Sequence, residues 1–89
     1  MGAICRFEFD ESVSKKDIEE QIALAIITAE CTFGKPKVRL HAAYCAADNK
    51  AVIDVSSKVG EHIAEVFTGL MSIEVGEENF KVERMRKRQ

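Results

Sequence analysis

The segment AICRFEFDESVSKKDIEEQIALAIITAE, residues 3–30, decides the fold because its hydrophobic period changes part-way along. Up to Phe9, apolar and polar residues alternate, which is the pattern of a strand with one buried face. From Ile18 onward the apolar residues recur at the spacing of an amphipathic α-helix. We expect the protected side of this strand to carry Ala3, Cys5, Phe7 and Phe9, and its other side to carry Ile4, Arg6 and Glu8.

The helix that follows this strand has a recognisable start and end. Ser14, three residues before Asp17, is typical of a capping box that opens a helix. Gly34 and Pro36 then predict its end, glycine first and proline just beyond. Its buried stripe is expected to consist of Ile18, Ile22, Ala25, Ile26 and Ala29.

Two further strands are predicted to form a hairpin. Residues 38–45 alternate, and residues 51–55 alternate again. Between them, the Ala47–Lys50 segment contains Asp48 and Asn49, which favour turns. The uncovered side of the hairpin is expected to carry Arg39, His41, Ala43, Val52 and Asp54.

A second helix is predicted after Ser57 or Gly60, either of which can cap it. Its end is ambiguous, and we favour termination at Gly69, with residues 71–75 forming a short extra strand. Phe80 and Val82 alternate with charged residues and indicate the last strand. The stripe of this helix is expected to be Val59, Ile63, Val66, Phe67 and Leu70.

This order of elements predicts an α+β fold, a ferredoxin-like β-α-β-β-α-β sandwich. Its antiparallel sheet would have the strand order 4-1-3-2, with both helices on one face. The 89 residues suffice for one domain, which we expect to span residues 1–83. Residues 84–89 form a basic C-terminal tail.

The charge distribution argues against a broad nucleic-acid-binding face. The net charge is −2, but four of the 13 basic residues lie in the tail. The remaining nine basic residues stand against 15 acidic ones, so the body of the domain is acidic. No apolar run approaches the length of a membrane span, and we expect a cytoplasmic protein without a membrane partner.

No cofactor or metal site is predicted. The three cysteines, Cys5, Cys31 and Cys45, lack metal-ligand spacing and are expected to be free thiols. A catalytic role for His41, next to Asp54 and Cys45 on the predicted sheet, lacks an oxyanion hole and a pocket. We therefore expect no catalytic residues.

One surface on the first helix favours protein–protein contact. Leu24, Ile27 and Cys31 lie about 180° from the buried stripe, at the 100° per residue of an α-helix. Apolar side chains clustered in this way indicate an interface more than scattered ones do. The hypothesis is a non-enzymatic interaction or regulatory module, self-associating or docking a protein partner through this helix.

The alternative is a nucleic-acid binder, because the outline of the chain resembles the RNA-recognition motif. That family stacks bases on aromatic residues of the first and third strands, and residues 50–55 contain none. The resemblance therefore implies the fold and no binding residue. Contacts to nucleic acid would come from Arg6, Arg39, Lys81, Arg84, Arg86, Lys87 and Arg88.

Overall fold

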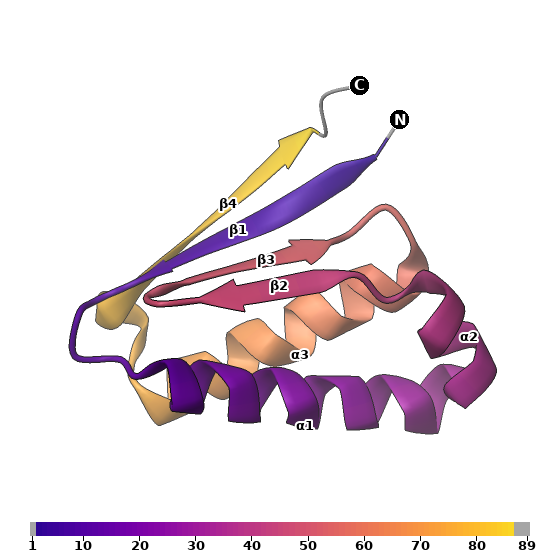
Figure 1. Cartoon of the computed structure of the whole chain (residues 1–89), viewed down its shortest axis with the longest axis horizontal. Coiled ribbons are helices and arrows are strands. Elements are labelled where there is room, and N and C mark those ends of the chain that lie inside the picture. The colour runs from indigo at the N-terminus through magenta and orange to yellow at the C-terminus, as the bar shows by residue number, and fades with distance from the viewer. Residues whose placement is uncertain (1, 87–89) are drawn as a thin grey trace.

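Four strands and three α-helices make up the chain in a computed structural model that describes residues 2–86 (Figure 1). The elements in chain order are β1 (Ala3–Phe9), α1 (Lys15–Phe33), α2 (Lys35–His41), β2 (Tyr44–Ala47), β3 (Lys50–Asp54), α3 (Lys58–Glu74), a 3₁₀ turn η1 (Glu77–Asn79) and β4 (Phe80–Arg86).

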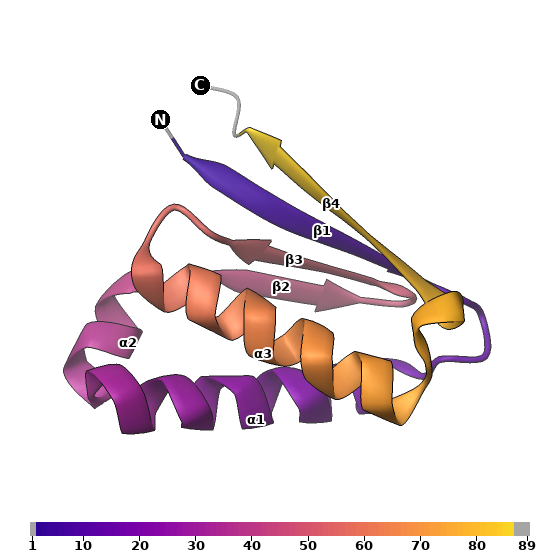
Figure 2. The ribbon, with the colours of Figure 1, turned by 180° about the vertical axis from the view of Figure 1, so that it is seen from behind.

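The strands form one antiparallel sheet in the order β2-β3-β1-β4. This is the predicted order read from the opposite edge, and the α+β class is confirmed. Within residues 2–86 the helices all lie on one side of the sheet, and the other face is uncovered (Figures 1 and 2). β1 lies in the interior of the sheet, so β2 and β4 are its two edges.

The core side of β1 is the predicted one. Phe7 is fully buried and Phe9 is 7% exposed. The ring of Phe67, from α3, packs edge-on against Phe7 with 4.9 Å between ring centroids. Aromatic pairs in this geometry add stability beyond the area that they bury. Ala3 and Cys5 are partly buried and pack against the same core.

The start and end of α1 also follow the prediction. Ser14 is its N-cap, and its hydroxyl accepts a hydrogen bond from the backbone N–H of Asp17 at 3.1 Å. Gly34 ends the helix at φ 89°, a left-handed conformation that a residue with a Cβ rarely adopts.

The predicted strand over residues 38–45 is wrong in its first half. Residues Lys35–His41 form α2, and β2 begins only at Tyr44. Pro36 lies in the first turn of α2, where its fixed φ suits a helix and its missing N–H costs nothing. Val38 is the one buried residue of α2, whereas Leu40 is 79% exposed.

The predicted end of the second helix at Gly69 and the extra strand after it are also wrong. α3 continues to Glu74 and takes in residues 71–74. Met71 is fully buried, four residues after Phe67 on the same side of the helix. The stripe of buried side chains therefore runs past Gly69, which has open space around it.

Candidate interaction surface

The three residues singled out on the first helix lie on the exposed side of α1. Leu24 is 47% exposed and Ile27 is 53% exposed, although both are large and apolar. Cys31 is exposed as a free thiol. These side chains are on the side of α1 away from Ile18, Ile22, Ala25 and Ala29, the buried residues that face the core.

A groove lies beside these exposed residues, between α1 and the edge strand β2. It has a volume of about 460 Å³, and Ile27 is part of its wall. Figure 1 shows α1 and β2 together on the near side of the molecule, with α3 and β4 behind them. The remaining lining residues are Glu19, Ile22, Ala23, Ile26, Glu30, Tyr44, Cys45 and Ala46.

Tyr44 is the aromatic residue in the wall of this groove. Its side chain points to the helix side of the sheet, because it pairs with the buried Ile53. It is nevertheless 52% exposed, since β2 is a short edge strand. A Tyr at the wall of an open apolar groove offers both a ring and a hydroxyl to a partner.

The uncovered sheet face carries paired charges of both signs. Arg6 donates a hydrogen bond to Glu83 on β4 at 2.8 Å and lies 3.7 Å from Glu8. The hydrogen bond to Glu83 and the charge of the two carboxylates raise the pKa of Arg6. Lys81 stands opposite Glu8 in the β1–β4 register. A face arranged in this way has little free positive charge for a phosphate.

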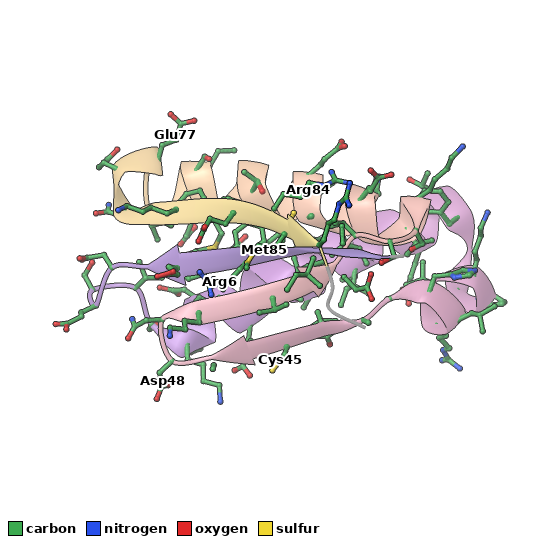
Figure 3. The ribbon with its side chains drawn as sticks, turned by 90° about the horizontal axis from the view of Figure 1, so that it is seen from above. Arg6, Cys45, Asp48, Glu77, Arg84 and Met85 are labelled. Carbon is green, nitrogen blue, oxygen red and sulfur yellow. The ribbon has the colours of Figure 1, made fainter. Side chains whose placement is uncertain are left out.

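Apart from Lys81, which shares the open face, the other described basic residues named for nucleic-acid contact lie away from Arg6. Arg84 lies on the opposite face of β4, where its guanidinium is 3.4 Å from a carboxylate oxygen of Glu61 on α3. Figure 3 shows the Arg84 side chain over α3, well apart from Arg6. Arg39 belongs to α2, not to the sheet, and Arg86 is the last residue of β4.

The last two members of that set, Lys87 and Arg88, lie outside the described residues. The five described members therefore occupy separate places: the open face, the helix side of β4, and α2. Arg84 and Arg86 line one hollow together with Glu61, and Arg6, Arg39 and Lys81 are not part of its lining.

The two histidines lie on different helices, and His41 is not where the sequence predicts it. His41 is the last residue of α2, so it does not share the sheet face with Asp54. His62, on α3, packs edge-on against Phe33 of α1, and its Nε2 is 3.2 Å from the Thr28 hydroxyl. Over residues 2–86, no group of three or more His, Cys, Asp and Glu side chains could hold a metal ion.

The three thiols differ in their surroundings. Burial raises the pKa of the Cys5 thiol, and the nearby Arg84 only partly offsets this effect. Cys31 and Cys45 are both exposed, on α1 and β2 respectively. Cys45 pairs with Val52, so its side chain belongs to the open face of the sheet, and Figure 3 shows it along the β2 edge.

None of the helices in the described part of the chain has the length and apolar character needed to cross a bilayer. Comparison of the chain with protein-family models, with curated proteins and with solved structures finds no match in any of the three.

Proposed function

We propose that this protein is a non-enzymatic interaction module that self-associates through α1 and the neighbouring edge of the sheet. The observation that carries the proposal is the coincidence of the exposed Ile27 with the apolar groove between α1 and β2. We also infer that the strand connectivity is the ferredoxin-like one, with α2 inserted between the first helix and the second strand.

Energetics favour the groove as part of the interface. Leu24 and Ile27 are about half exposed, so covering each gains about 1 kcal/mol. Association costs at least about 4 kcal/mol in lost translational and rotational freedom. The helix stripe alone is therefore too small, and a stable contact needs the adjoining groove and strand edge as well.

The experiment is a measurement of solution mass by light scattering over a range of concentrations. Wild type is expected to be larger than a monomer, and Leu24→Glu with Ile27→Lys is expected to give a folded monomer. Ile73→Lys is the matched control, because Ile73 is 85% exposed on α3, away from the groove. Wild type that stays monomeric at high micromolar concentration would remove the basis of the proposal.

The alternative hypothesis of nucleic-acid binding has less support from the geometry. Arg6 and Arg84 are each engaged by a carboxylate, and they lie on opposite faces of the sheet. Binding would then depend on the C-terminal basic residues. A mobility shift at low salt that deletion of residues 84–89 abolishes would revive this hypothesis.

A further inference from the structure

The two edges of the sheet differ in how they are protected. Edge strands usually carry charges or proline, which prevent pairing with another chain. β4 has four charged residues along its seven, whereas β2 has none. The β2 sequence is Tyr44, Cys45, Ala46 and Ala47, and it is the unprotected edge.

The hydrogen bonds of the hairpin determine which backbone groups β2 leaves free. Asp54 donates its N–H to the carbonyl of Ala43 at 2.8 Å, so this pair is a hydrogen-bonded one. Hydrogen-bonded and non-hydrogen-bonded pairs alternate along an antiparallel ladder. In the register of β2 with β3, Tyr44 and Ala46 therefore direct their N–H and C=O groups away from β3, toward the open edge.

We propose that the occupant of this edge is a second copy of the chain, paired antiparallel through β2 about a two-fold axis at Cys45. This inference rests on the proposed function and names the partner and its register. Tyr44 of each copy then lies opposite Ala46 of the other, and the outward N–H and C=O groups of both residues are all paired. The two four-stranded sheets become one continuous sheet.

Side-chain size favours this register over the two other symmetric ones. Tyr44 and Ala46 both point to the helix side, so the pairing sets a large side chain opposite a small one, twice. Centring on Tyr44 would oppose two rings, and centring on Ala46 would leave a gap between two methyl groups. Both alternatives also leave outward backbone groups of β2 unpaired.

The same pairing places the second copy beside the groove. The groove runs along β2, and Ala46 is part of its wall. In the proposed pairing, Tyr44 of the second copy lies opposite Ala46, and its side chain points to the helix side of the sheet. Ile27 lies in this wall, whereas Leu24 and Cys31 lie outside it. Burial of Ile27 together with the groove therefore indicates a β2-centred dimer. Burial of Leu24 and Cys31 without the groove indicates a dimer formed by the exposed side of α1 alone.

Cys45 provides a direct test of the register. On the two-fold axis the two copies of Cys45 form a non-hydrogen-bonded pair, with Cα atoms about 4.5 Å apart and side chains on the same face. That separation lies within the range that a disulfide spans. Diamide oxidises two such thiols to one disulfide and is itself reduced to the hydrazine by the two electrons and two protons released.

The experiment combines oxidation with solution mass. Diamide should cross-link wild type into a dimer, as seen on a non-reducing gel. It should also cross-link the double variant Cys5→Ala with Cys31→Ala, in which Cys45 is the remaining thiol. Cys45→Ala should not cross-link, although it retains Cys31, which is also exposed. A wild type that is dimeric by mass but cross-links through Cys31, or not at all, overturns the register and leaves the proposed function standing. A monomeric mass overturns both.

A second variant tests the backbone pairing without any thiol. Ala46→Pro removes an N–H that points to the open edge, so the hairpin with β3 keeps its hydrogen bonds. It should stay folded by circular dichroism and weaken dimerisation about tenfold or more. Ile73→Lys, on the exposed side of α3 and outside the groove, is the matched control and should leave the dissociation constant nearly unchanged. Unchanged dimerisation of a folded Ala46→Pro would overturn the proposed pairing.

Discussion

Gly60, in the first turn of α3, approaches the backbone of Asp54 so closely that a Cβ at this position would lie 1.9 Å from the Asp54 carbonyl oxygen. The carbonyl carbon of Asp54 would be 2.9 Å away. These are backbone atoms at the end of β3, so they cannot move aside as a flexible side chain can. The close approach sets where α3 starts beneath the sheet, immediately after the cap at Ser57.

Replacing Gly60 by alanine is therefore expected to lower the free energy of unfolding by about 1–3 kcal/mol or more. Gly69→Ala, on the same helix, is the matched substitution, because nothing lies within 4 Å of the added Cβ. It should raise the free energy of unfolding by about 0.5–1 kcal/mol, since alanine is the better helix former. Urea denaturation of both variants measures the two effects, and equal effects would contradict the placement of α3.

Met71→Ala tests the continuation of α3 past Gly69. Met71 is fully buried, so its truncation should cost about 2–5 kcal/mol in the free energy of unfolding. Ile73, two residues on, is 85% exposed, and Ile73→Ala should change stability by less than about 0.5 kcal/mol. Alternation in a strand would place both side chains on one face, so comparable losses would favour the strand.

Hydrogen bonds from Ser12 to Asp10 make part of the free energy of unfolding depend on pH in the acid range. The Ser12 hydroxyl and backbone N–H donate to the Asp10 carboxylate at 2.7 and 3.3 Å, and these bonds lower the pKa of Asp10. A lowered pKa stabilises the fold above the unfolded-state pKa, and this contribution is lost as the pH falls through the folded-state value. Ser12→Ala should raise the pKa of Asp10, as NMR titration would show. Its stability deficit should be present at neutral pH and disappear in acid.

Added salt should strengthen dimerisation and weaken nucleic-acid binding. The charged residues that line the groove, Glu19 and Glu30, are both acidic, so two copies repel each other there. Raising the salt from about 0.1 M to about 1 M shortens the Debye length from about 10 Å to about 3 Å. Dimerisation should therefore strengthen with salt in sedimentation measurements. Nucleic-acid binding should weaken, and a dimer that dissociates as salt rises would contradict the proposed surface.

The sequence was sufficient to predict the elements whose pattern is long or capped. The alternation of β1 placed Phe7 and Phe9 in the core, and the Ser14 cap located the start of α1. Both depend on local signals that tertiary contacts reinforce. The strand order could also be predicted, since right-handed connections and short loops leave few arrangements.

The errors lie where short apolar runs fit two periods. Val38 and Leu40 alternate as in a strand, but in seven residues a single buried position also satisfies a helix. Pro36 was interpreted as a stop for α1, although proline equally opens a helix. For α3, the spacing of Phe67 and Met71 was the available signal, and the low helix propensity of Gly69 outweighed it in the interpretation.

The candidate surface was only partly accessible to such an analysis. Leu24 and Ile27 could be found from helical spacing within one segment. The groove also needs Tyr44, whose exposure depends on β2 being an edge and on how α1 lies beneath it. Contacts between segments so far apart in the chain leave no periodic trace in the sequence.

The interior position of β1 has a consequence for how the chain acquires its structure. β1 precedes the other three described strands in the chain, but one of its two neighbours is β4, so that Ile4 pairs with Met85. Such a distant pairing must wait until β4 has been synthesised, which slows folding relative to chains with local contacts. Until then the β4-facing side of the earliest strand has no pairing partner, and nascent chains are most vulnerable to misassembly along it.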